Sequence, residues 1–156
     1  LHVRSRRQRQ MCIRDRHKAN HFKDVQTYYF HNCIYSKVYK TAECEIGEWV
    51  DLDYLFRHYD KDYKVIIVGD AQMAPEELLD KNGNYRGPND GLSGYEWCQL
   101  LTQKYKKCVW LNPRYHGELT RMHWMESEDK LAKLFHMYLL SVDGLKDAIT
   151  YLLKTK

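Results

Sequence analysis

Tyr63-Lys-Val-Ile-Ile-Val-Gly69 is the stretch of sequence that decides the fold. Its core, Val65–Val68, is an unbroken run of β-branched residues, which predicts a strand covered on both faces, as strands are in a parallel sheet. Cys108–Leu111 has the same apolar character and stops at Asn112-Pro113, so it predicts a second buried strand. Two buried strands of this kind indicate a sheet with helices on its faces.

The residues before this stretch predict a hairpin and a helix. Val25–His31 and Ile34–Tyr39 are dense in β-branched and aromatic residues, and they flank the short polar connection Asn32-Cys33. Asp51 is a candidate N-cap for a helix over Leu52–Tyr59, whose apolar residues fall on one face.

Helices are also expected after each buried strand. Pro75 fits the first turn of a short helix, and Ser93-Gly-Tyr-Glu96 is a capping box that starts a helix to about Lys106. Two closing helices follow Ser127 and Ser141; the first has apolar positions at Leu131, Leu134, Phe135, Tyr138 and Leu139. The order is hairpin, α, β, α, β, α, α, which predicts an α/β sheet with right-handed crossovers.

Leu1–Arg16 is interpreted as a non-native segment. Met11–Arg16, Met-Cys-Ile-Arg-Asp-Arg, back-translates into the transposase end sequence used to prepare sequencing libraries, and the chain starts at Leu1 without an initiator Met. Translated adapter sequence is excluded from fold reasoning. We therefore expect residues 1–16 to pack on nothing, and residues 17–156 to form a partial domain.

The charge of the remaining chain argues against a nucleic-acid partner. Leu1–Arg16 holds six Arg and one acid, so the other 140 residues carry 19 basic and 20 acidic side chains, a net charge of −1. A nearly neutral domain lacks the basic stripe that binds nucleic acid. No run approaches the roughly 18 apolar residues of a membrane span, so no membrane partner is expected either.

The cysteines outside Leu1–Arg16 are expected to be reduced. These cysteines are Cys33, Cys44, Cys98 and Cys108, and they lack C-x-x-C spacing. Two of them, Cys98 and Cys108, fall in apolar patterns. Half-buried free cysteines are typical of cytosolic proteins, so a cytoplasmic protein is expected. A zinc site assembled from scattered Cys and His is the alternative.

Two residues follow the predicted strands, at the sheet edge where open α/β folds bind ligands. Asp70 follows the Val65–Val68 strand, and a carboxylate there can ligate Mg²⁺ directly or through water. The alternative is that Asp70 only caps the next turn. Asn112 follows the second strand and is the candidate binding residue of the same crevice, unless it makes a local turn.

No constellation in the sequence indicates catalysis. Helix capping and solvated turns explain the carboxylate pairs Asp51-Leu-Asp53 and Asp60-Lys-Asp62. His116 and His123 are accompanied by no nucleophile at a suitable spacing, and Gly87–Gly91 lacks the Lys and Gly spacing of a phosphate-binding loop. We therefore expect that the protein is not an enzyme.

Three segments, in this order and spacing, resemble bacterial von Willebrand factor type A domain proteins of the CoxE-like kind: Tyr63–Leu79, Val109–Pro113 and Phe135–Ile149. The similarity spans roughly Val25 to Leu153. It implies a doubly wound, mainly parallel sheet of the von Willebrand factor A or Rossmann-like class. It also implies a metal-ion-dependent adhesion site, in which a divalent ion bridges the domain to an acidic group of a partner.

Only one of the three parts of that family's metal motif has a clear match here, and it is Asp70. The Asp-x-Ser-x-Ser element that follows the family's first strand is absent from this sequence, and Thr41 is not assigned to the middle part. The resemblance therefore implies a truncated domain without its central first strand. Loss of that strand leaves two halves of the sheet with unpaired backbone edges.

The resemblance implies a non-enzymatic, metal-assisted protein-interaction module in a cytoplasmic bacterial protein. It suggests an AAA+ ATPase of the MoxR type as the partner, in complex remodelling or cofactor insertion. Mg²⁺ is the cofactor expected for the full-length parent, and its binding is expected to be weak or absent in this chain. The alternatives are an α/β metal-dependent hydrolase that uses Asp70, and a metal-free scaffold pseudo-domain.

Overall fold

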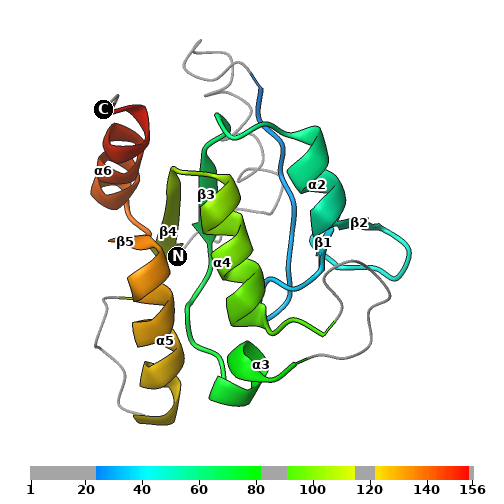
Figure 1. Ribbon diagram of the computed structural model, residues 1–156. Helices are drawn as coiled ribbons and strands as arrows, with labels where there is room; N and C mark the ends of the chain where they lie inside the picture. Colours follow the sequence, from blue (N-terminus) through cyan, green and yellow to red (C-terminus); the bar gives the residue numbers. More distant parts are fainter. Residues whose placement is uncertain (1–23, 82–90, 115–121, 155–156) are drawn as a thin grey trace.

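Three parallel strands form the central sheet of the computed structural model (Figure 1). They are β3 (Val65–Val68), β4 (Cys108–Asn112) and β5 (His136–Leu139), paired in the order β3-β4-β5. The structure describes residues 24–81, 91–114 and 122–154, so the prediction for residues 1–16 lies outside the described residues. Within them the fold is mixed α/β, with a parallel sheet flanked by helices, as the sequence predicts.

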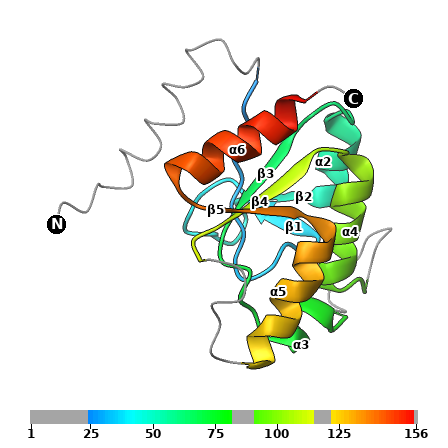
Figure 2. The same cartoon turned by 90° about the vertical axis from the view of Figure 1, so that its left-hand side faces the viewer.

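The middle strand, β4, carries the core because all five of its residues are buried. Alternate side chains of a strand point to opposite faces of the sheet. On one face, Trp110 belongs to the main core together with residues of α4 (Gly94–Lys104) and α5 (Met122–Leu134). On the other face, α6 (Val142–Leu153) packs on a smaller apolar cluster around Val109. Figure 2 shows the sheet between these two layers of helices.

A second, two-stranded sheet consists of β1 (Lys37–Tyr39) and β2 (Trp49–Asp51), paired antiparallel. The predicted hairpin partner of β1 was wrong, because Val25–His31 contributes only an isolated bridge to it, at Tyr29. The turn that leads into β2 contains Gly47 at φ +96, a left-handed conformation that costs glycine little.

Local capping signals place the starts of α4 and α6 correctly. The Ser93 hydroxyl accepts from the Glu96 amide at 3.3 Å, while the Glu96 carboxylate accepts from the Ser93 amide at 2.8 Å. Ser141 likewise accepts from the Gly144 amide at 3.0 Å. Pro75 opens the short helix α3 (Pro75–Leu79). No helix in the described residues is long and apolar enough to cross a membrane.

The start of α2 (Leu52–His58) is at the predicted residue, although not through the predicted interaction. Asp51 occupies the N-cap position, but its side chain makes no capping hydrogen bond. The carboxylate in the first turn, Asp53, still lies near the positive end of the helix dipole.

The first of the two predicted closing helices is wrong in its extent. α5 begins at Met122, before Ser127, and ends at Leu134, so the residues expected in its last turns form β5 instead. The apolar spacing of these residues fits a helix. However, the edge of β4 offers backbone hydrogen-bond partners to His136–Leu139, and pairing with that edge makes them a strand.

The prediction that β3 is covered on both faces is also wrong. Ile67 is 4% exposed, whereas Ile66 is 37% and Val68 is 51% exposed. On that side the helix α6 packs mainly on β4 and β5. The β-branched composition of the strand therefore reflects its extended backbone more than complete burial.

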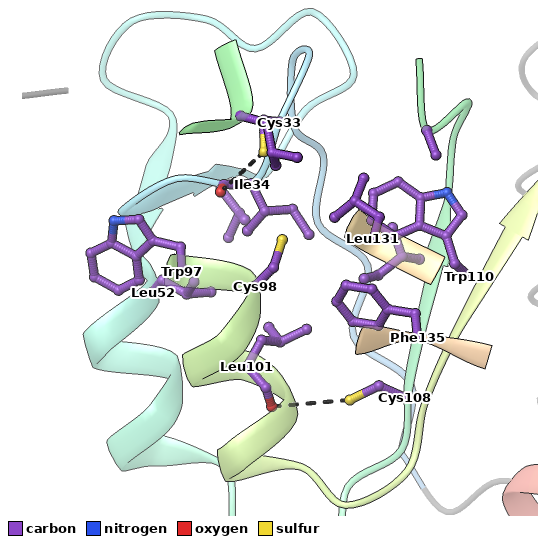
Figure 3. Packing of buried hydrophobic residues seen from close by; sticks show 14 of the residues in the cluster. Cys33, Ile34, Leu52, Trp97, Cys98, Leu101, Cys108, Trp110, Leu131 and Phe135 are labelled. Atoms are coloured by element: carbon purple, nitrogen blue, oxygen red, sulfur yellow. Dashed lines mark hydrogen bonds between the residues drawn. The ribbon is translucent and has the colours of Figure 1, made fainter. Parts of the chain in front are cut away.

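The cysteines match the expected reduced state. All four in the described residues are free, and three are buried in the core, where Figure 3 shows Cys33, Cys98 and Cys108. Burial raises the pKa of the Cys108 thiol to about 12. The pKa of Cys98 is raised by its hydrogen bond with Cys33 and by burial. No group of three His, Cys, Asp or Glu side chains in the described ranges is placed to hold a metal ion such as zinc.

Alkaline pH should destabilise the fold through Cys108. Its pKa rises from an ordinary 9.0 to about 12 on folding, so the stabilisation is complete below pH 9 and is lost as the pH climbs through that interval. Urea unfolding at a series of pH values should show the free energy of unfolding falling above pH 9. Cys108→Ala, although less stable, should fall less steeply. Equal slopes in both proteins would contradict this account.

Trp110 should be the most sensitive aromatic residue of the sheet. Trp110→Phe removes the indole donor that bonds the Gly69 carbonyl and leaves space in the core, so the free energy of unfolding should drop by about 1–3 kcal/mol. The matched control is Trp49→Phe, at a half-buried position of β2, which should cost less than about 1 kcal/mol. Urea denaturation measures both values, and similar losses in the two variants would refute the prediction.

Candidate functional site

A crevice opens at the carboxyl end of β3. Its volume is about 280 Å³. One wall is the end of β3 with the residues that follow it, and the opposite wall is an extended segment near the start of the described chain. The lining residues are Val68, Gly69, Asp70 and Gln72 on the first wall, and Tyr28, Tyr29, Phe30 and Asn32 on the second.

Backbone contacts hold Asp70 at this edge. The Gly69 amide donates to the Leu111 carbonyl at 3.2 Å, and the Gly69 carbonyl accepts from the Trp110 indole at 2.7 Å. The next residue therefore leaves the sheet with a defined direction, and the Asp70 side chain is exposed in the crevice. This is the position expected from the sequence, while a role in metal binding stays a prediction.

Tyrosine hydroxyls hold the opposite wall. The Tyr63 hydroxyl donates to the Asp24 carboxylate at 2.9 Å, and the hydroxyls of Tyr28 and Tyr59 lie 3.1 Å apart. The hydrogen bond to Asp24 raises the pKa of Tyr63, and burial raises that of Tyr28. Both phenols therefore keep their protons at neutral pH and can go on donating hydrogen bonds.

The second candidate, Asn112, is not brought to the crevice. It is buried, its amide nitrogen donates to the Glu128 carboxylate at 3.2 Å, and its amide oxygen accepts from the Arg114 backbone at 3.0 Å. Asn112 is absent from the residues that line the crevice. This arrangement is the local turn that the sequence left open as an alternative, joined to a contact with α5.

The donors around the crevice do not fit a resident Mg²⁺ ion. Among the lining residues that the structure describes, Asp70 is the only carboxylate, beside the amides of Asn32 and Gln72. The Asn32 amide nitrogen already donates to Glu77 at 2.8 Å, and the buried Gln72 amide nitrogen has no hydrogen-bond partner in the described part of the chain. Mg²⁺ needs near-octahedral oxygen ligation, which one exposed carboxylate does not anchor.

Sequence reasoning missed two features of this region. Glu128 is 2% exposed, although nothing in its acidic helical neighbourhood distinguishes it from solvated carboxylates. The wall at Tyr28–Asn32 was also missed as part of the site, because it was assigned to a hairpin. Its tyrosine-rich composition was the only available signal.

Comparisons with protein families, with curated proteins and with solved structures each found no match to this chain.

Substitutions at Asn112 and at Asp70 should differ in their effect on the free energy of unfolding. Asn112→Ala strips a buried carboxylate of a hydrogen-bond donor and leaves the Arg114 amide unpaired, so the free energy of unfolding should fall by about 1–3 kcal/mol. Asp70→Ala removes an exposed side chain and should change it by less than about 0.5 kcal/mol. Urea denaturation of the two variants gives the comparison, and a loss of similar size at Asp70 would show that its carboxylate has a structural role.

Proposed function

We propose that this chain is a protein-interaction module, with the crevice beside Asp70 as its contact surface. The observation that carries the proposal is an exposed carboxylate at the carboxyl end of a parallel strand, in an open crevice of about 280 Å³. Open α/β sheets bind their ligands at this edge. A carboxylate there can accept charge-assisted hydrogen bonds from a partner, which are stronger than those between neutral groups.

The finer form of the proposal is a domain of the von Willebrand factor A class, CoxE-like, with a doubly wound sheet. Three parallel strands in chain order, separated by helices on both faces, support that class. The separation of β1 and β2 from β3 supports a sheet that lacks its central strand. The position of Asp70 after β3 supports its assignment to the family's metal motif.

The role of Mg²⁺ follows from the same resemblance and is limited by the donor set. One carboxylate gives this chain little affinity for the ion, so a metal contact at Asp70 would depend on oxygen ligands from elsewhere. The partner that the resemblance suggests is a MoxR-type AAA+ ATPase. In this proposal the chain belongs to a cytoplasmic protein that acts with the ATPase in complex remodelling or cofactor insertion. The role proposed for the chain is binding rather than catalysis.

Asp70→Asn should weaken partner binding without weakening the fold. Loss of one charged acceptor corresponds to about 1.5–3 kcal/mol, which is roughly a tenfold or larger rise in Kd. The probe is a purified MoxR-type AAA+ ATPase, titrated in a calorimeter in the presence of Mg²⁺. Asp80→Asn, another exposed acid outside the crevice lining, is the matched control and should leave Kd unchanged.

Equal Kd values for the two variants would remove Asp70 from the interface, and absence of binding by the unsubstituted chain would reject the ATPase as partner. Titration of the chain with Mg²⁺ alone should show no saturable binding. Tight Mg²⁺ binding that is lost in Asp70→Asn would contradict the account of an incomplete donor set.

A further inference from the structure

Two backbone edges face each other across the crevice. On one side, Tyr29 exchanges both of its backbone hydrogen bonds with Tyr39 of β1, at 2.8 and 2.7 Å. Neighbouring residues in an extended chain direct their backbone groups to opposite sides. The N–H and C=O groups of Tyr28 and Phe30 therefore point away from β1, and no backbone hydrogen bond to them is found among the described residues.

The edge of β3 has the same property. The amides of Val65 and Gly69 donate to β4, at 2.9 and 3.2 Å, so the odd-numbered residues pair with that strand. The backbone groups of the residues between them, Ile66 and Val68, point to the other side. In the described residues no strand pairs with β3 on that side, because β3 is the end strand of its sheet.

The two edges run in the same direction. Asp24 bonds the hydroxyl of Tyr63 before β3, and the ring of Phe30 lies against Gly69 at its end, where a Cβ added to the glycine would be 3.4 Å away. We call the crevice between these two edges the slot, and on both of its walls the backbone groups that face away from β1 and β4 have no strand partner among the described residues.

We propose that this slot binds an extended segment of a partner protein as an added β-strand. Such binding uses main-chain hydrogen bonds for affinity and alternate side chains for specificity. One added strand satisfies both edges at once and joins the two sheets. The exposed face of β3 beside the slot, formed by Ile66 and Val68, favours β-branched residues at alternate positions of the partner segment.

Charge defines the two ends of the partner segment. The exposed residues of the β3 edge alternate as Lys64, Ile66, Val68 and Asp70. Cross-strand neighbours of opposite charge are favourable, and like charges are unfavourable. The segment therefore carries an acidic residue beside Lys64, a basic residue beside Asp70 and two β-branched residues between them, all at every second position. The intervening positions, which face Phe30 and the core, take small residues.

This mode of binding differs from the proposed contact at the Asp70 carboxylate, because the backbone of β3 provides most of the affinity. The Asp70→Asn variant separates the two. It should lower the affinity of a strand-forming peptide only about two- to fivefold, the value of one cross-strand charge pair. The binding of a partner through the carboxylate alone should fall tenfold or more, because it loses a charged hydrogen-bond acceptor.

The test uses the whole chain and a short fluorescent peptide, Glu-Ala-Val-Gly-Val-Ala-Lys, together with the same sequence reversed, because either strand direction fits the pattern. Fluorescence anisotropy should show saturable binding of at least one of them. A peptide of the same composition with the two valines adjacent should bind at least about tenfold more weakly, because one valine then faces the wrong side of the sheet. N-methylation of the central glycine should weaken binding by roughly two- to tenfold, since it removes one backbone hydrogen bond.

Hydrogen exchange supplies a control within the same strand. Peptide binding should slow amide exchange at Ile66 and Val68, whose amides face the slot, and leave Val65 and Ile67 unchanged because they already donate to β4. Lys64→Glu should lower the affinity for the peptide by about two- to tenfold. Replacing the peptide's Glu with Lys should restore that affinity.

Failure of both peptides to bind, equal binding of the scrambled peptide, or unchanged exchange at Ile66 and Val68 would each overturn the proposal. Self-association of the chain that the peptides do not reverse would also overturn it, since a second copy would then be the occupant.

Discussion

The hydrogen bond from the Trp110 indole to the Gly69 carbonyl joins the parts of the structure on which the site depends. Trp110 is fully buried in the middle strand, and its ring contacts Phe30 from the extended segment and Phe135 at the end of α5. One side chain therefore ties β4, the end of β3 and the opposite wall of the crevice together. Because its donor is buried, losing the acceptor would cost the full desolvation of the N–H group, so the end of β3 is held in place.

The second constraint is that the two sheets share a core without sharing a strand pair. Residues from both sides contribute to one hydrophobic cluster, among them Val38 of β1 and Ile67 of β3. Hydrophobic burial has no direction, so it can join the sheets while their facing edges stay unpaired. Backbone hydrogen bonds are directional, and they are what the hollow between the edges lacks. This difference explains how a well-packed interior coexists with an exposed strand edge.

Two carboxylates show how position decides the role of an acid. Glu128 lies on α5 against the end of β4, where it is buried and bonded to Asn112, so it belongs to the framework that holds the turn after that strand. Asp70 follows β3 and lines the open crevice, where its carboxylate remains accessible. Removal of a buried bonded acid disturbs the fold, whereas removal of an accessible one changes only what binds there.

The sequence by itself determined the elements whose signals are local. The helix starts at Ser93 and Ser141 were predictable because a cap involves residues within one turn. The strands at Val65–Val68 and Cys108–Leu111 were predictable from unbroken apolar composition, and the position of Asp70 followed from the end of the first one.

Only the tertiary structure decided which surfaces meet. It turned His136–Leu139 from a predicted helix into a strand, because the edge of β4 offered backbone partners. It left one face of β3 exposed, because α6 packs mainly on the neighbouring strands. It also buried Asn112 against Glu128 rather than opening it to the crevice. Each outcome depends on contacts with residues that are distant in the sequence, and no local pattern of side chains encodes such contacts.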